Sequence, residues 1–308
     1  MTFTGEHKDV FGVEPICRVL TQHGAPIAPS TYYAAKTRPP SARAVRDGQL
    51  RAEITRVWKE NYEVYGADKV WLELNREGIA TARCTVERLM RDLGLQGARR
   101  GRKVRTTVPG KDGHRAPDLL GRDFTAPAPN RRWVADFTYV AAWCGIVYVA
   151  FVVDIYSRAI VGWSAATHKR AKLVLDALQM ALWRRDRDGK PAGPGLVHHS
   201  DAGSQGRFTS FAFTAHLIEA GIDASIGTVG DALDNALMES TIGLYKTELI
   251  KKAGPWKSLA DVELATAGYV DWFNNRRLHT AIGGIPPAEH EAAYYAQNQP
   301  HPGAGANN

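Results

Sequence analysis

Three acidic residues stand in sequence settings that suit metal-assisted chemistry on phosphate esters. Asp136 interrupts the strand-like run WVADFTYV, Asp201 follows an apolar Gly-Leu-Val on a Ser-Asp-Ala-Gly turn, and Glu239 lies on an expected helix. A charge within a hydrophobic strand is costly unless something neutralises it. Carboxylate oxygens are the ligands that Mg²⁺ prefers. The three acids therefore predict a catalytic site in which all three bind a pair of Mg²⁺ ions, which Mn²⁺ could replace.

A two-ion site of this kind activates a nucleophile and stabilises a leaving oxygen in phosphoryl transfer. Each acid taken alone could be an ordinary turn or cap residue, and only the joint arrangement favours a site. Asp154 also ends a strand, in VVDIYSR, where a turn role is expected. Asp231 and Asp234, in DALDN, are expected to precede and cap the helix that carries the glutamate.

Two kinds of neighbour could assist the acids. Lys246 follows Glu239 by seven residues, which is two helical turns along the same face. It could contact a DNA phosphate, or it could be an ordinary exposed lysine. His198 and His199 shortly precede Asp201, and adjacent residues of a strand face opposite sides. At most one of the two histidines is therefore expected to face the site.

The charge of the chain is uneven. Its 308 residues carry a net charge of +7. Residues 1–132 hold 24 Lys and Arg against 15 Asp and Glu, whereas residues 133–308 hold 15 against 17. A basic N-terminal part joined to a slightly acidic C-terminal part indicates an anion-binding segment attached to a metal-dependent catalytic domain. A solvated surface could also produce this asymmetry, so charge by itself only favours double-stranded DNA as the partner.

The composition indicates a folded protein outside membranes. Hydrophobic residues make up 44% of the chain, which allows a buried core. Cys17, Cys84 and Cys144 fit neither a zinc pattern nor a disulfide framework and are expected to be reduced. The N-terminus does not have the pattern of a signal peptide, and the apolar run at 146–153 is too short to cross a bilayer. We therefore expect a cytoplasmic protein with no membrane partner.

Hydrophobic periodicity predicts an N-terminal part built of helices. Residues 1–42 are expected to form a helical segment, in which Ser30 or Thr31 caps a helix. Residues 43–97 are expected to form helices at 49–62, 67–76 and 81–93, arranged like a helix-turn-helix. The third helix could enter a major groove of DNA. Alternatively, the three helices could form a plain bundle in which the basic residues of the third helix are exposed to solvent. Its candidate DNA contacts are Arg83, Arg88 and Arg91.

Residues 98–130 are expected to form a basic linker that follows DNA phosphates with little sequence preference. A basic run on its own is often only a solvated segment. The candidate phosphate contacts in this run are Arg99, Arg100, Arg102, Lys103 and Arg105.

From residue 131 the pattern becomes α/β. Strands are expected at 133–140, 146–154 and 159–165, joined by short turns that imply an antiparallel meander. A helix at 172–184, a strand at 195–199, a helix at 209–220, a strand at 224–227 and a helix at 234–250 follow. The order βββαβαβα is the ribonuclease H-like pattern, a mixed five-stranded sheet flanked by helices, over residues 131–252. A helical extension over 253–296, with a helix at 259–276, and a disordered tail over 297–308 are expected after it.

The motifs together resemble a known family. WVADFTYV, VHHSDAGSQ, GDALDNALMESTIGLYKTELI and YVDWFNNRRLH, with the upstream GADKVWLELNREGI, are similar to the OrfB-type transposases of the insertion sequence three family, bacterial relatives of retroviral integrases. The resemblance runs over nearly the whole chain. It implies that Asp136, Asp201 and Glu239 form an acidic triad and that Lys246 is the basic residue that follows it. Thirty-seven residues separate Asp201 from Glu239, two more than is usual in the family, and a loop near 206–208 could absorb them.

The resemblance implies a DDE transposase catalytic subunit, which frees a 3′-OH at the end of an insertion element and joins it to other DNA. It also implies a bacterial protein, associated with the nucleoid when bound to DNA, that acts as a homo-oligomer. A further implied partner is the product of an upstream frame, which supplies a helix-turn-helix and a leucine zipper. Two alternatives stay open: a ribonuclease H-like nuclease or resolvase that does not join strands, and a transposase-derived DNA-binding protein without catalysis.

Overall fold

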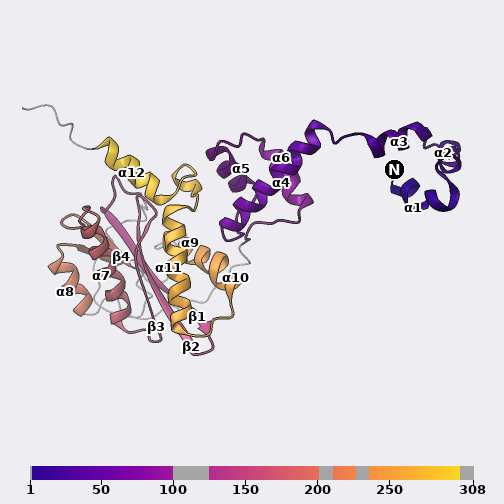
Figure 1. Ribbon diagram of the computed structural model, residues 1–308. Helices are drawn as coiled ribbons and strands as arrows, with labels where there is room; N and C mark the ends of the chain where they lie inside the picture. The colour runs from indigo at the N-terminus through magenta and orange to yellow at the C-terminus, as the bar shows by residue number, and fades with distance from the viewer. Residues whose placement is uncertain (1, 100–124, 201–210, 227–235, 299–308) are drawn as a thin grey trace, which may run out of the picture. The chain divides into compact units, whose positions relative to one another are not determined.

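The computed structural model describes residues 2–99, 125–200, 211–226 and 236–298, and Figure 1 shows their helices and strands. Contacts within the chain divide it into two compact units, Met1–Ile54 and Thr55–Asn308. The boundary falls inside helix α4 (Ala42–Glu60), so each unit contains part of that helix. Residues 100–124 of the expected linker and 299–308 of the expected tail lie outside the described residues.

The first unit begins with three short helices around a small core. The helices are α1 (Thr2–Phe11), α2 (Val13–Gln22) and α3 (Pro29–Thr37). Val13 and Cys17 of α2 pack with Tyr32 of α3, and all three side chains are buried. Ile27, in the turn that joins the two helices, packs against this cluster from its edge. The short N-terminal helices therefore have a core of their own.

The start of α3 differs from the prediction. The sequence predicts Ser30 or Thr31 as its cap, but the helix begins at Pro29, with Ala28 as the N-cap and no side-chain hydrogen bond to the first turn. Proline suits the first helical position because its ring fixes φ near the helical value and its missing N–H would be unpaired there anyway. The predicted cap is therefore wrong, and Pro29 starts the helix without one.

Two helices after α4 complete an arrangement like a helix-turn-helix. α5 (Ala67–Arg76) has the predicted bounds, and α6 (Arg83–Asp92) is slightly shorter than the predicted 81–93. α4 begins at Ala42, well before the predicted residue 49. Gly78, with φ of +83°, turns the chain after α5 in a conformation that glycine adopts without strain. The side chains that α5 and α6 bury at helical spacing are those of Val70, Leu74, Val86, Leu89 and Met90.

Five strands form one mixed sheet. They are β1 (Arg132–Ala142), β2 (Gly145–Asp154), β3 (Ile160–Ala166), β4 (Val197–Ser200) and β5 (Asp223–Ile226). Their order is β3-β2-β1-β4-β5, with β1, β2 and β3 antiparallel and with β4 and β5 parallel to β1. Short turns allow only antiparallel neighbours, whereas the later strands return through helices and so run parallel. The predicted ribonuclease H-like fold class is confirmed.

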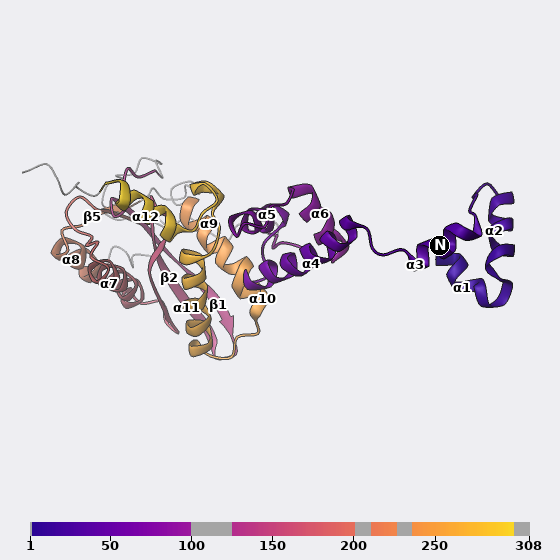
Figure 2. The same ribbon diagram turned by 45° about the horizontal axis from the view of Figure 1, so that its top comes forward.

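Helices cover both faces of the sheet, as Figures 1 and 2 show. α7 (Ala171–Arg187) and α8 (Phe211–Glu219) pack on one face, and α9 (Ala236–Tyr245) and α11 (Leu259–Asn275) pack on the other. Ala150 and Val152 of β2 contact the α7 side. Phe151, between them, faces the opposite way, where the ring of Tyr245 lies 5.0 Å from its own. Alternate residues of one strand thus belong to two different layers.

The helix predicted at 234–250 is interrupted. α9 ends at Tyr245, and a π-helical turn, η1 (Lys246–Ile250), and a short helix, α10 (Lys251–Ala253), follow it. Residues 234 and 235 lie outside the described residues. π-turns are rare because each takes an extra residue into its hydrogen-bonded ring, so they persist where a side chain benefits. Here the benefit is the inward position of Glu248, described below. The turn η2 (Thr280–Ile282) and α12 (Pro287–Gln297) complete the described chain.

The stretch between α4 and α5 is held against the C-terminal part of the same unit. The indole N–H of Trp272 donates a hydrogen bond of 3.0 Å to the side-chain oxygen of Asn61. The hydroxyl of Tyr65 accepts one of 2.8 Å from the backbone N–H of Leu278. The helix-turn-helix-like part of this unit is therefore joined to α11 by specific side-chain contacts.

Helix α7 approaches β3 so closely that only glycine fits at one position, which gives a testable prediction. A Cβ on Gly162 would collide with the carbonyl oxygen of Ala177 and lie 2.8 Å from the Cβ of Ala181. Overpacking of a tight core costs about 1–3 kcal/mol, so Gly162→Ala should lower the thermal unfolding temperature. Gly48→Ala is the control, because nothing lies within 4 Å of its Cβ position and alanine favours the helix. Equal effects of the two changes would contradict the close approach.

Among the described helices, none is both long enough and apolar enough to cross a membrane.

Candidate active site

Asp136 lies on β1 immediately beyond the part of that strand that pairs with β4. The parallel pairing runs from Arg132 opposite Val197 to Ala135 opposite Ser200. Asp136 is half-buried, and one of its carboxylate oxygens accepts a hydrogen bond of 2.7 Å from the backbone N–H of Phe137. The carboxylate therefore sits at the carboxyl end of β4. Asp201, the residue after Ser200, lies outside the described residues.

Glu239 lies in the first turn of α9, and its side chain is exposed. The opposite face of α9 is fixed by Met238, Thr241 and Tyr245, which are all buried. The hydroxyl of Tyr245 shares a hydrogen bond of 2.7 Å with that of Thr266 on α11. Since α9 also packs against β1, its buried face holds the helix beside the strand that carries Asp136.

The electrostatic environment of Lys246 includes the carboxylate of Asp136. Burial lowers the pKa of the half-buried Lys246 ammonium, Lys251 lowers it further, and the carboxylate of Asp136 partly opposes both. The ammonium nitrogen lies 4.6 Å from the ring centroid of Tyr139, also on β1, which is a cation–π contact. The sequence predicts Lys246 on the face of one continuous helix that carries Glu239. In the structure Lys246 is instead the first residue of η1, and it faces Tyr139 on β1.

The turn that carries Lys246 is anchored by a buried ion pair. Glu248, within η1, accepts two hydrogen bonds from the guanidinium of Arg277, at 2.6 and 2.9 Å. It accepts a third, of 3.0 Å, from the hydroxyl of Tyr269 on α11. The side chains of Glu248 and Arg277 are only 7% and 5% exposed, so this bidentate pair is screened very little by water. The pair ties the end of the α9 segment to the residues that follow α11.

Sequence reasoning did not find this ion pair. Arg277 lies in the segment NNRRLH and Glu248 in KTELI, 29 residues earlier. The signal that could have indicated it is a glutamate on the inward side of an otherwise apolar helix end. Such a charge needs a buried partner of opposite sign.

The described donors fit a hard metal ion only in part. Within the described ranges, no group of three or more His, Cys, Asp or Glu side chains could hold a metal ion. Asp136 and Glu239 present only carboxylate oxygens, which suit Mg²⁺ and do not suit metals that select thiolates. The donor chemistry of Asp136 and Glu239 is therefore compatible with Mg²⁺.

The neighbouring candidates are structural residues. Both histidines before Asp201 are buried, and His199 shares a hydrogen bond of 2.9 Å with Ser225 on β5. Burial lowers the pKa of His198 to about 4, so it is neutral at pH 7. Asp154 is fully buried and accepts hydrogen bonds from the backbone N–H groups of Asn130 and Ser157. Its role is to hold the turn after β2, as the sequence suggests.

The candidate DNA contacts on α6 are exposed or half-exposed arginines with acidic neighbours. Arg83 pairs with Asp68 of α5, Arg88 lies 3.6 Å from Asp92, and Arg91 lies 3.6 Å from Glu87. Exposed pairs of this kind contribute little to stability, so a phosphate could replace the acid at small cost. Arg99 is exposed at the end of the described segment. The other four candidates, Arg100, Arg102, Lys103 and Arg105, lie outside the described residues.

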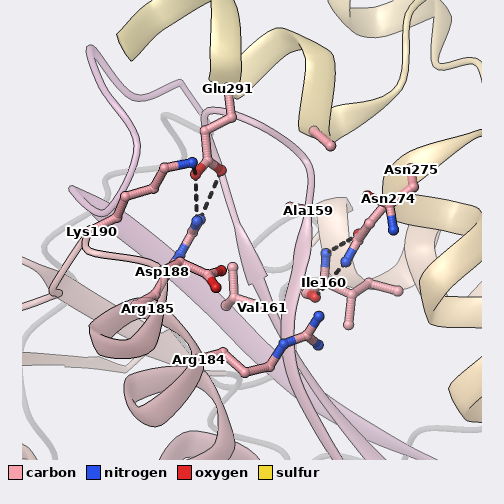
Figure 3. A pocket seen from close by; sticks show the side chains of 11 residues that line it. Ala159, Ile160, Val161, Arg184, Arg185, Asp188, Lys190, Asn274, Asn275 and Glu291 are labelled. Carbon is pink, nitrogen blue, oxygen red and sulfur yellow. Dashed lines mark hydrogen bonds and ion pairs between the residues drawn. The ribbon is translucent and has the colours of Figure 1, made fainter. Parts of the chain in front are cut away.

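A small hollow of about 150 Å³ lies elsewhere on the second unit, between β3, α7, α11 and α12. Figure 3 shows Arg185 of α7 pointing to Glu291 of α12, with hydrogen bonds of 2.5 and 2.9 Å. The side-chain amide of Asn274 makes two bonds of 2.9 Å to the backbone of Ile160. These contacts join α12 to α7 and α11 to β3. Asp136 and Glu239 are not among the lining residues.

Comparison with known proteins matches most of the chain to three family models. The Integrase core domain family matches residues 126–232, and a second family of the same description matches residues 220–287. The HTH-like domain family matches residues 45–103. The first match contains Asp136 and Asp201, and the second contains Glu239, Lys246 and Arg277.

Two relatives are similar over almost the whole chain. A putative transposase for insertion sequence element IS986/IS6110 of Mycobacterium tuberculosis is 56% identical over 280 residues, covering 91% of this chain and 100% of the relative. The transposase for insertion sequence element IS629 of Shigella sonnei is 50% identical over 294 residues, covering 94% of each.

Among solved structures, a structure of the HTLV-2 integrase catalytic core domain shares 20% identity with a TM-score of 0.41, covering 54% of this chain and 98% of that one.

The sheet topology and the matching families define a DNA-processing enzyme with an integrase catalytic core and an HTH-like domain. The chain belongs to the transposases of the insertion sequence three family, as its identity to the relatives over nearly its full length shows. Its activity is therefore in DNA transposition and integration.

Proposed function

We propose that the chain is a DDE catalytic subunit that cleaves the ends of an insertion element and joins the freed 3′-OH to DNA. Asp136, Asp201 and Glu239 are the proposed catalytic residues and metal ligands. Two Mg²⁺ ions bound to these carboxylates would activate the attacking water or 3′-OH and stabilise the oxygen that leaves. No covalent bond between protein and DNA is needed.

The register of the parallel strands carries this proposal. Ala135, the residue before Asp136, pairs with Ser200, the residue before Asp201. Consecutive Cα atoms are only about 3.8 Å apart, so the chain connectivity favours neighbouring positions for the two aspartates at the end of β4. α9 packs against β1 and presents an exposed Glu239 in its first turn. These three placements favour one site over three separate turn or cap residues.

The remaining basic residues would hold the DNA. Lys246, which lies over Tyr139 of the strand that carries Asp136, would bind a phosphate next to the bond that is cut. Arg83, Arg88 and Arg91 of α6 would contact the duplex, and the basic run at 99–105 would follow its backbone. Double-stranded DNA at element ends and target is the proposed substrate. A homo-oligomer on DNA, together with an upstream-frame product, is the proposed assembly.

The deciding experiment is Mg²⁺-dependent processing of a labelled element end by the full chain, with and without the upstream-frame product. We expect a nick that exposes a 3′-OH and, with a pre-cleaved end, joining of that end to a second duplex. EDTA should stop both reactions. Cleavage without joining would instead identify a nuclease or resolvase, and DNA binding with neither reaction would identify a non-catalytic binding protein.

Lys246→Ala should weaken binding of an element-end duplex and reduce the dependence of log K on log salt by about one, as expected for one lost phosphate contact. The measurement is a binding titration at several salt concentrations without Mg²⁺. Lys172→Ala is the matched control, because Lys172 is an exposed lysine on α7 that pairs with Asp176. A Lys246 variant with the salt slope of the parent would remove this residue from the DNA interface.

A further inference from the structure

The first 44 residues lie before the family matches and have no assigned role. They nevertheless include three of the described helices, α1, α2 and α3, with a core of their own. α2 and α3 are joined by residues 23–28, and Gly24 in that turn has φ of +85°. Two short helices packed through a glycine-containing turn are the architecture of a helix-turn-helix.

Helix α3 buries one residue and leaves a stripe free. Tyr32 is the residue of α3 that enters the core, at 3% exposure. Thr31, Ala34, Ala35 and Arg38 are all exposed. The first three share one face of α3, and Arg38, the C-cap residue just after the helix, follows at i+7. Together with Pro39 they line a hollow of about 340 Å³. This face, called here the α3 stripe, is therefore open along the whole helix.

The side chains of the α3 stripe are of the kinds that read base edges. Arginine forms two parallel hydrogen bonds to guanine in the major groove, and alanine or the threonine methyl contacts the methyl group of thymine. Small residues in the middle of the stripe also let the helix approach the floor of a groove. A stripe that served as a protein-binding surface would be expected to carry large apolar side chains at these positions.

The charge around the stripe complements DNA. Residues 15–46 contain no Asp or Glu. Among the described residues, Arg18, Lys36 and Arg38 form no ion pair with an acid, and Lys36 instead lies over the ring of Tyr32 at 5.8 Å. A segment of one sign with unneutralised cations attracts phosphate. The basic residues of residues 15–46 are Arg18, Lys36, Arg38, Arg43 and Arg46.

We propose that α2 and α3 form a second helix-turn-helix, in which α3 lies in the major groove of double-stranded DNA and reads bases with Thr31 and Arg38. The α6 arginines and the basic run at 99–105 supply a separate contact. The chain then reads two stretches of DNA sequence, one with α3 and one with α6. The catalytic role proposed above does not enter into this inference.

Base reading by α3 can be tested by selecting binding sites from a pool of random 40-base-pair duplexes. The full chain is used, in EDTA, so that no strand is cut. The parent is expected to enrich a motif with two parts. Thr31→Ser, which removes the methyl group, combined with Arg38→Ala should lose the preference in one part by about 10-fold or more at each affected base pair, and should keep the other. Variants of Arg83, Arg88 and Arg91 should have no effect on the part that α3 reads.

Arg38→Lys separates reading from charge. It keeps the positive charge but cannot form the planar two-bond contact to guanine, so it should lose the base preference while the overall affinity changes less than about 3-fold. Lys8→Ala is the control within the same unit, because Lys8 is an α1 lysine paired with Asp9. Circular dichroism of each variant should match the parent, since all the changed side chains are exposed.

One result would overturn the proposal: a pool selected by the Thr31 and Arg38 variants that is identical to the parent's, which includes the case in which the parent selects no sequence. If sedimentation velocity then also shows altered self-association of the variants, the α3 stripe is a contact between copies of the chain.

Discussion

Asp136→Asn is expected to abolish Mg²⁺-dependent cleavage and joining, with a rate loss of at least about 10³-fold. The amide is neutral and offers one oxygen in place of two, so it cannot hold a pair of cations. Loss of several kcal/mol of stabilisation of the transition state corresponds to a loss of this size. Asp201→Asn and Glu239→Gln should behave in the same way. Binding of an element-end duplex should be largely unchanged, because none of the three acids is proposed to contact the DNA directly.

The measurement is single-turnover cleavage of a labelled element end, with a gel-shift titration of the same preparations. Asp176→Asn on α7 is the matched control, since this partly exposed acid pairs with Lys172 and lies on the opposite side of the sheet from α9. Substantial cleavage by any one of the three variants would remove that residue from the proposed site. Loss of DNA binding together with cleavage would point to misfolding instead of lost chemistry.

Arg277→Met is expected to destabilise the unit Thr55–Asn308 by about 3–5 kcal/mol, the usual cost of leaving one member of a buried ion pair without its partner. Glu248 would keep only the hydrogen bond from Tyr269 and would lie uncompensated beneath η1. The π-turn itself should then relax toward a regular helix and move Lys246. Urea unfolding, followed by tryptophan fluorescence, measures the effect.

The exposed pair of the same unit provides the comparison. Arg76 and Glu289 lie 2.6 Å apart at the surface, and Arg76→Met should cost less than about 1 kcal/mol. Glu248→Leu combined with Arg277→Met should recover much of the loss, because a buried pair replaced by apolar residues is often tolerated. A loss from Arg277→Met no greater than that from Arg76→Met would show that the pair does not anchor η1.

Local sequence patterns predicted which helices and strands form, but they predicted poorly where a helix begins and where it is interrupted. The three strands of the meander are visible in sequence because alternation and short turns are properties of neighbouring residues. α5 has the predicted bounds for the same reason. The π-turn at Lys246 is not visible in the local pattern, and the glutamate within it pairs with an arginine 29 residues later in the sequence. The early start of α4 at Ala42 and the proline start of α3 are boundary effects that periodicity does not define.

For the candidate site too, the residue types could be predicted from the sequence, whereas the contacts between distant segments could not. The sequence predicts a functional role for Asp136 because a charge inside an apolar strand is costly unless something neutralises it. For Glu239, an exposed helix residue, the prediction rests only on the joint arrangement of the three acids. What the sequence could not supply is the position of α9 beside β1, which depends on the packing of Tyr245 between Phe151 and α11. Nor could it show that His199 bonds Ser225, a partner on a strand that is separate in sequence.

The short parallel pairing of β4 with β1 has a consequence for the order in which the sheet forms during synthesis. Ala135 and Ser200 meet only after about 65 residues of intervening chain have been closed into a loop, whereas the β1–β2 hairpin needs only a tight turn. Contacts between distant residues form slowly. A chain emerging from the ribosome can thus complete its hairpin while β4 is still unmade, so under the function proposed above a partial product would lack the second of the proposed catalytic aspartates.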